Sequence, residues 1–305
     1  NKKFIRIIPK MDIKNGLLIK GINLDGLRIL GDPYNFAEHY YKSGADEIFY
    51  IDNVASLYGT NNLSKFVTKT SKNLFVPLSV GGGIHCLSQI EDFLKKGADK
   101  VSINSAAINN INFVKKASRV FGSSTITCII EAIKIDDKYF ITKENGRDII
   151  NIDPKVWAKK LEDHGAGEIF LTSIKNEGTY EGFDIDLTKK ISSGVKIPVI
   201  AHGGAGSFKH VYDVIRKTNI SGVSIAGFFH YDICQNFKFD KIKIGNTFFL
   251  ENQKKKKSKE LLQNLKNFLH KKGIKVRKWK KRESASLILI LITFIAFMRH
   301  VKLQD

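Results

Sequence analysis

The stretch "GADEIFYID", Gly44 to Asp52, nearly recurs 121 residues later as "GAGEIFLTS", Gly165 to Ser173. Other pieces repeat at the same offset: Pro77 and Pro198 open apolar runs that end in glycines, "PLSVGGG" and "PVIAHGG". A general likeness between strand–helix units does not explain one offset that holds at several separate places. The repeat therefore indicates two similar halves of one fold, related by a pseudo-twofold axis.

Around these repeats, strand-like apolar runs alternate with helical patterns from end to end. Strict alternation favours a parallel sheet, and continuous apolar runs are typical of strands buried on both faces. Eight such units in about 250 residues is the size of a closed (β/α)8 TIM barrel, which we prefer to an open doubly wound sheet. The expected strands span residues 4–9, 47–52, 76–80, 100–104, 124–132, 168–173, 197–201 and 222–226.

Barrel enzymes work at the carboxyl ends of their strands, and two of those ends carry glycine clusters. "GGG" at 81–83 is followed by "NSA" at 104–106, and "GGAG" at 203–206 by "AGF" at 226–228. Glycines let backbone N–H groups approach an anion, and a following helix adds partial positive charge. Two clusters on opposite sides of one rim predict two phosphate sites, one with Gly82 and Gly83 and one with Gly203, Gly204 and Gly227.

Two acids are placed symmetrically at the same rim. Asp12 follows the first strand, and a half-repeat of 119 residues leads from it to Glu131, at the end of the fifth strand. The pseudo-twofold axis therefore sets two carboxylates across the barrel mouth, between the two phosphate sites. Paired acids in different environments can divide general acid and general base work. Either acid alone would read equally well as a solvated loop residue or a helix cap.

Four charged residues stand instead at the amino-terminal starts of strands, at the bottom of the barrel. They are Arg6, Glu47, Lys100 and Glu168. A solvated ion network that holds the bottom closed is the usual interpretation of such a set. The functional interpretation is a gate across the central axis of the barrel.

Several motifs, in order, resemble the HisF family, the cyclase subunits of imidazole glycerol phosphate synthase. They include "GADE", "VGGGI", "GADKVSIN" and "IPVIA.GGAG", within a match from about residue 4 to residue 232. The resemblance implies a barrel that receives ammonia from a HisH-type glutaminase on its amino-terminal face. Ammonia would pass up the axis and attack a ribulosyl aminoimidazole carboxamide bisphosphate, yielding imidazole glycerol phosphate and an aminoimidazole carboxamide ribotide. It implies neither a cofactor nor a metal ion.

The resemblance also assigns residues. Asp12 matches the first catalytic carboxylate, and the four bottom charges match the ammonia gate of the family. One phosphate site is matched by Gly82, Asn104 and Ser105, and the other by Gly178, Gly204 and Ala226.

Three positions depart from the family pattern. Glu131 stands where the family has its second catalytic aspartate, Glu177 is the acid beside the glycine of the second phosphate site, and Gly227 replaces a rim serine. The extra methylene of Glu131 matters because a displacement of ~1 Å at a catalytic group can cost on the order of 10²-fold in rate.

Two stretches, "KGINLDGLRILGDPYNFAEHYY" and "CIIEAIK", look more like HisF-type paralogues that feed ammonia to the amidation of a surface sugar. Both interpretations share the fold, the glutaminase partner and the gate, and differ in whether the barrel closes an imidazole ring. We favour the cyclase, since Asp12, both phosphate sites and the gate are all present.

Other function classes are less well supported by the residues. A HisA-type isomerase shares the half-barrel repeat and the two phosphate sites, but needs neither the bottom charges nor a glutaminase. A silent ammonia conduit would keep the bottom charges and lose the acid pair, so that Asp12 argues against it and Glu131 for it. An RNA-binding role rests on the basic tail alone and lacks interleaved aromatic residues.

Charge and composition divide the chain into a barrel, residues 1–277, and a tail, residues 278–305. Of the net charge of +20, +13 lies after residue 252, so the basic excess says little about the main body. Residues 261–277 are expected to form a last amphipathic helix and a short strand. The uncharged run Ser284 to Met298 is shorter than the ~20 residues of a spanning helix, which favours a wrong-frame extension over a membrane anchor. Three scattered cysteines suit a reducing cytoplasm.

Overall fold

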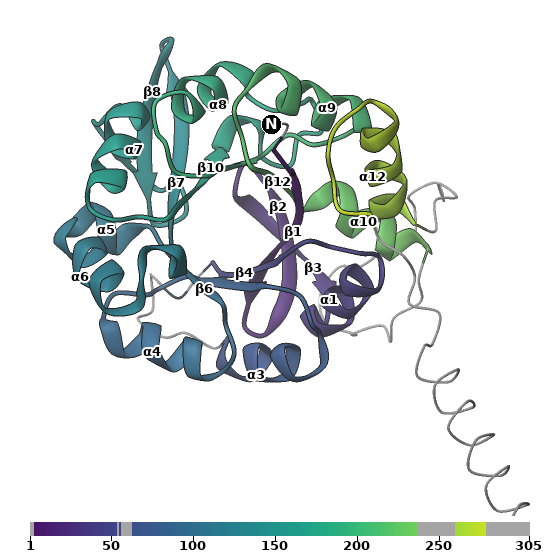
Figure 1. The fold of residues 1–305 in the computed structure, drawn as a ribbon, viewed down its shortest axis with the longest axis horizontal. Coiled ribbons are helices and arrows are strands. Elements are labelled where there is room, and N and C mark those ends of the chain that lie inside the picture. The colour runs from purple at the N-terminus through teal and green to yellow at the C-terminus, as the bar shows by residue number, and fades with distance from the viewer. Residues whose placement is uncertain (1–2, 54, 56–62, 237–259, 279–305) are drawn as a thin grey trace, which may run out of the picture.

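The computed structural model describes residues 3–53, 55, 63–236 and 260–278, and its centre is a closed barrel of eight parallel strands (Figure 1). Parallel pairing of β1 with β12, in the register Arg6↔Gly222 to Pro9↔Ile225, closes the barrel. This confirms the predicted (β/α)8 fold and excludes an open doubly wound sheet. In spatial order the strands are β1 (Arg6–Lys14), β4 (Ile48–Asp52), β5 (Leu78–Gly81), β6 (Lys100–Ile103), β7 (Ile126–Ile135), β10 (Glu168–Ser173), β11 (Val199–His202) and β12 (Gly222–Ile225).

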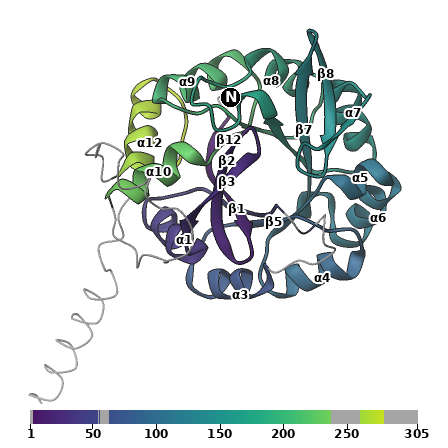
Figure 2. The ribbon, with the colours of Figure 1, turned by 180° about the vertical axis from the view of Figure 1, so that it is seen from behind.

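Amphipathic helices surround the barrel, as both views show (Figure 2). Several begin at a side-chain cap: Asp32 and Asp153 precede a proline at the first helical position, and each accepts a backbone N–H of the first turn. The helices are α1 (Pro33–Lys42), α3 (Ser64–Asn73), α4 (Leu87–Lys95), α5 (Ser105–Asn109), α6 (Asn112–Phe121), α7 (Pro154–Asp163), α8 (Ile185–Ser192), α9 (Phe208–Lys217), α10 (Gly227–Asn236) and α12 (Leu261–Lys271), with 3-10 turns at Ser123–Thr125 and Ile174–Asn176.

Two β-hairpins extend the barrel strands at the mouth, and neither was predicted. After β1 the chain turns back as β2 (Leu17–Ile22) and β3 (Asp25–Gly31), and after β7 as β8 (Lys138–Lys143) and β9 (Asp148–Ile150). Both begin with a two-residue turn in which both residues have positive φ, Asn15–Gly16 and Asp136–Asp137. The sequence had suggested that Asp12 lies just beyond the first strand. Because β1 runs on to Lys14, Asp12 instead lies within it.

The register of the strands confirms the pseudo-twofold repeat. Asp12 pairs with Ile51 of β4, and Glu131 pairs with Thr172 of β10, which lies 121 residues after Ile51. The hairpin strands repeat the relation, since Asp12 also pairs with Ile19 and Glu131 with Thr142. The two acids therefore occupy equivalent places in the two halves.

Two apolar cores hold the barrel together. The larger lies between the strands and the surrounding helices, and the smaller fills the barrel itself. Phe49 and Phe170, equivalent residues of the two halves, pack against each other within the smaller one, with their ring centroids 4.4 Å apart and their planes tilted by 30°. Its other members are Ile8, Ile51, Ile129 and Ile200. This apolar layer separates the bottom of the barrel from its mouth.

The described chain ends beside the bottom of the barrel. α12 packs there, but the short strand expected before residue 277 does not form, because Lys275 makes a single backbone hydrogen bond, from Ile5 N–H at 2.9 Å. Arg277 forms an ion pair with Asp46 at 2.9 Å. Residues 279–305, which hold the apolar run of the tail, lie outside the described residues, so the boundary at 277 stays a prediction. Within the described ranges, no helix is both long and apolar enough to cross a membrane.

Candidate active site

Asp12 and Glu131 are held in different electrostatic environments at the mouth. Burial would raise the pKa of Asp12, but the charges of Lys10 and Lys20 and a hydrogen bond from Lys10 hold it below its usual value. Burial raises the pKa of Glu131 to about 7, and the nearby charge of Asp12 adds to this effect. The Glu131 side chain keeps some exposure, because it faces a pocket. Near neutral pH one carboxylate is therefore ionised and the other is close to its titration midpoint.

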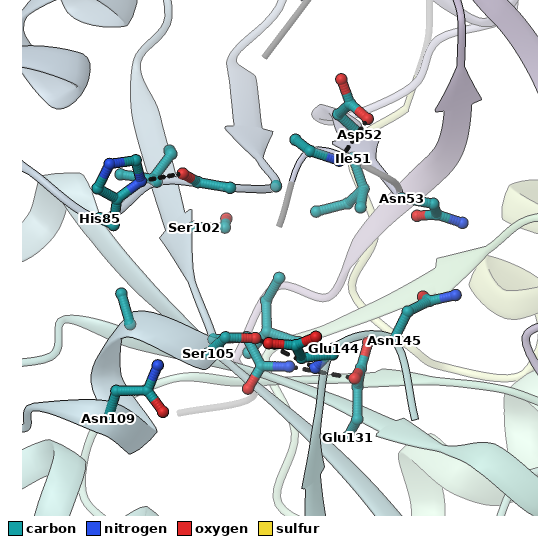
Figure 3. Close-up of a pocket in the computed structure, with 17 residues that line it drawn as sticks. Ile51, Asp52, Asn53, His85, Ser102, Ser105, Asn109, Glu131, Glu144 and Asn145 are labelled. Carbon is teal, nitrogen blue, oxygen red and sulfur yellow. Dashed lines mark hydrogen bonds between the residues drawn. The ribbon is translucent and has the colours of Figure 1, made fainter. Parts of the chain in front are cut away.

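The first predicted phosphate site is a pocket of about 340 Å³ beside Glu131 (Figure 3). Gly82, Gly83, Asn104 and Ser105 all line it, so the structure brings these four predicted residues together with one of the two acids. Both glycines have positive φ, and a Cβ on Gly82 would lie 2.2 Å from the carbonyl oxygen of Asp52. Only glycine fits this turn, which brings the backbone up to the pocket.

Two buried side-chain oxygens of residues that line this pocket have no hydrogen-bond partner. The Asn104 amide nitrogen donates to Glu131 at 3.1 Å, whereas its Oδ1 is buried without a partner, as is Oδ1 of Asn53. Unsatisfied buried polar groups are uncommon in native proteins and call for an explanation. Figure 3 shows Glu144 and Asn145 beside Glu131, with Asp52 and Asn53 across the space. Sequence reasoning missed these four residues; the "ENG" turn of the second hairpin was the available signal for Glu144 and Asn145.

The second predicted phosphate site is assembled but filled. Gly178, Gly203, Gly204, Ala226 and Gly227 lie together around a cavity of about 20 Å³, room for roughly one water molecule. A buried ion pair of Lys20 with Glu177 occupies the site, and Lys20 also donates to the carbonyl of Gly21 at 2.6 Å. The hydroxyl of Tyr180 is 2.8 Å from where a Cβ on Gly227 would lie.

His202 also lines this second site and was not singled out from the sequence. Its Nδ1 lies 3.2 Å from the carbonyl of Ser224, and its Nε2 is buried without a hydrogen-bond partner. Burial lowers the pKa of His202 to about 3, so the imidazole is neutral. Its position at the end of β11, directly before the glycines, was the available signal.

The four bottom charges meet in one closed network. Arg6 donates to Glu47 at 2.7 Å and also contacts Glu168, while Lys100 reaches Glu47 at 3.2 Å and Glu168 at 2.9 Å. Ser79 adds a hydrogen bond to Glu47 at 2.6 Å. The two carboxylates are buried, whereas Arg6 and Lys100 keep 27% and 20% of their side-chain exposure and so face the outside of the bottom. The network has no net formal charge and crosses the barrel axis below the apolar layer.

Among the residues that the structure describes, no group of three or more His, Cys, Asp or Glu side chains is placed to hold a metal ion.

These features define a (β/α)8-barrel protein whose site lies at the carboxyl ends of its strands. The chain belongs to the histidine biosynthesis protein family, whose sequence model matches residues 6–235. Among its relatives is a Legionella pneumophila protein named imidazole glycerol phosphate synthase subunit HisF, 48% identical over 206 residues, or 67% of this chain and 97% of the relative. Proteins of the same name from Bacillus cereus and Clostridium botulinum are 43% and 42% identical, over 74% of this chain and 90% of each relative. The resemblance to HisF found in the sequence is thereby confirmed.

Proposed function

We propose that this chain is the cyclase subunit of an imidazole glycerol phosphate synthase and acts in histidine biosynthesis. The observation that carries the proposal is the pair of carboxylates between two glycine-lined sites on opposite sides of one barrel mouth. The names of the relatives support this reaction over sugar amidation. A cytoplasmic setting suits the free thiols of Cys86, Cys128 and Cys234.

The two carboxylates divide the proton transfers. Asp12, with its lowered pKa, is ionised at working pH and serves as the general base when ammonia adds to the substrate. Glu131, whose pKa is about 7, holds a proton near neutrality and serves as the general acid for the departing ribotide. A general acid is most effective when its pKa lies near the operating pH, which is where Glu131 titrates.

The substrate lies across the mouth with one phosphate at each glycine-lined site. The pocket at Gly82, Gly83, Asn104 and Ser105 is open and takes the first phosphate as it stands. The second site takes a phosphate when Lys20 exchanges Glu177 for the ligand, because the present cavity is too small for both. The ammonium group of Lys20 thus has an anionic partner before and after the exchange, which limits the free-energy cost of moving a buried charge.

Ammonia enters through the bottom network from a glutaminase of the HisH type. Two exposed aromatic residues support docking on the amino-terminal face. Phe4 (64% exposed) and Phe75 (81% exposed) both lie in segments that lead into barrel strands at this face. Large apolar side chains that are exposed on one face are typical of interaction sites. Breaking one ion pair of the network opens a path to the apolar layer, which a neutral molecule crosses more readily than an ion.

The test is an assay of the purified chain with an ammonium salt and the bisphosphate substrate. We expect both products from the wild type, and loss of turnover in Asp12→Asn with unchanged circular dichroism; its melting temperature should fall, because the substitution removes the ionic partner of the buried Lys10. General acid–base groups contribute about 10²–10⁴-fold, so a variant that keeps more than about a tenth of the rate removes Asp12 from the mechanism. Folded wild-type protein that yields no imidazole product overturns the proposed function.

A further inference from the structure

Lys10 is a buried lysine at the mouth of the barrel. It lies on β1 between Ile8 and Asp12. These three residues share one face of the strand, because every second side chain points to the same side, and Ile8 belongs to the core inside the barrel. Lys10 is 6% exposed, and its ammonium group forms an ion pair with Oδ1 of Asp12. Lysine is almost never buried in this way unless it is paired, so its presence here needs a reason.

The other half of the barrel shows that the fold does not require this lysine. The residue equivalent to Lys10 is Ile129 of β7: Lys10 pairs with Phe49 and Ile129 pairs with Phe170, the same place in the repeat. An apolar side chain therefore suits this inward-facing position of a barrel strand. The two carboxylates consequently differ in what lies beneath them, since Asp12 stands above an ammonium group and Glu131 above an isoleucine.

We propose that Lys10 is a positioning residue of the reaction, which fixes Asp12 in place as the ionised carboxylate and so leaves Glu131 as the member of the pair that carries the proton. The inference rests on the proposed function for the identity of the reaction. One half of the barrel then supplies a base and the other an acid, because Lys10 in the first half stands where the second half has Ile129, one layer below the two carboxylates.

The remaining charged groups around the pair do not replace Lys10. Lys20 reaches toward Asp12 from β2, but its ammonium group is paired with Glu177. His202 from β11 and His230 from α10 also lie near Asp12, and His230 contacts the carbonyl of Lys10 at 2.9 Å; burial lowers the pKa of each to about 3, so both are neutral. Glu131 receives hydrogen bonds from Asn104 and from the backbone of Gly146. The direct ionic contact to Asp12 is that of Lys10.

The test compares Lys10→Met with Lys10→Arg in the full chain, by two measurements. Carbon-13 titration of labelled aspartate and glutamate carboxyl groups, with Asp12→Asn and Glu131→Gln to assign the signals, reports both acids directly. We expect Asp12 to titrate at least about one pH unit higher in Lys10→Met, because burial then acts without its opposing charge, and to stay near its wild-type value in Lys10→Arg. Glu131 shifts upward as well, since the charge of Lys10 lowers its pKa.

Activity supplies the second measurement. With ammonium at a fixed concentration of free ammonia, kcat of Lys10→Met should fall on the order of 10²-fold at pH 7, with its pH optimum moved upward and KM for the bisphosphate little changed. Lys10→Arg should restore both the rate and the profile. The matched control is Lys266→Met, which removes another buried lysine–aspartate pair, with Asp46 at 2.7 Å, and should lower stability without moving either carboxyl titration.

The outcomes separate the two proposals. If both carboxyl groups of Lys10→Met titrate as in the wild type, the role of Lys10 is refuted, whatever the activity. If the wild type shows no cyclase turnover but the carboxyl groups shift as expected, the proposed function is wrong and Lys10 still sets the charges of the pair. A fall in rate with an unchanged pH profile would make Lys10 a packing residue only.

Discussion

Glu131 should cost the folded protein stability above neutral pH, and Glu131→Gln should recover it. The pKa of Glu131 is raised from 4.5 to about 7 by burial, a difference that corresponds to at most about 3 kcal/mol of unfolding free energy. The sign follows from linkage: below pH 4.5 the carboxyl is protonated in both states, and between 4.5 and 7 only the unfolded state ionises. Stability is therefore lost as the pH rises through this window, and the loss is complete above it.

The substitution to glutamine is nearly isosteric, and its oxygen can still accept the hydrogen bond from Asn104. Thermal unfolding of both proteins should agree at pH 4.5, and the variant should melt higher at pH 8 by up to roughly 6 °C, given about 2 °C per kcal/mol for a domain of this size. Groups other than Glu131 titrate in both proteins and cancel in the difference. A melting difference that is the same at both pH values would refute the raised pKa, and with it the assignment of Glu131 as the acid.

Three further predictions concern the gate, the family departure and the tail. Lys100→Met leaves the bottom network with a net charge of −1 and should impair glutamine-dependent turnover with the partner while sparing turnover with added ammonium; an equal loss with both nitrogen sources would make the network structural. Glu131→Asp should be tolerated or faster in a true cyclase, because it restores the residue of the family; if steady-state assays find neither protein active, the barrel does not close the ring. Truncation after Arg277 should leave melting temperature and solubility unchanged or improved, and loss of membrane-fraction association on truncation would instead favour an anchor.

The fold was largely predictable because its strongest signals are local. All eight barrel strands were found from apolar runs, and the offset of 121 residues identified the two halves. The two hairpins were missed although their turns carry readable signals: Asn15–Gly16 is a favoured two-residue hairpin turn, and Asp136–Asp137 adopts the same positive φ values. They were missed because the predicted strands ended at residues 9 and 132, where charged residues begin to alternate with apolar ones in β1 and β7.

The site was predictable where chemistry lies in the backbone and less so where it lies in side-chain contacts. The glycines of both sites come together because only glycine adopts the turns after the strands, as the positive φ of Gly82 and Gly204 shows. The side chains that fill the second site, Lys20 and Glu177, belong to segments 157 residues apart. No local pattern reports such a contact, and its strength depends on burial that only the closed barrel creates.

The place of Lys10 follows from the alternation of side chains along β1. Every second residue of β1 faces the barrel interior, which places Arg6 in the bottom network, Ile8 in the apolar layer, and Lys10 and Asp12 at the mouth. One strand thus supplies a member to each stage of the proposed path, from the entry of ammonia to its reaction. Its counterpart β7 carries Thr127, Ile129 and Glu131 at its inward positions, in order from the bottom of the barrel to the mouth. A duplicated half-barrel becomes a directional catalyst when the two copies of one strand differ in charge, and directly below the two carboxylates that difference lies at Lys10 and Ile129.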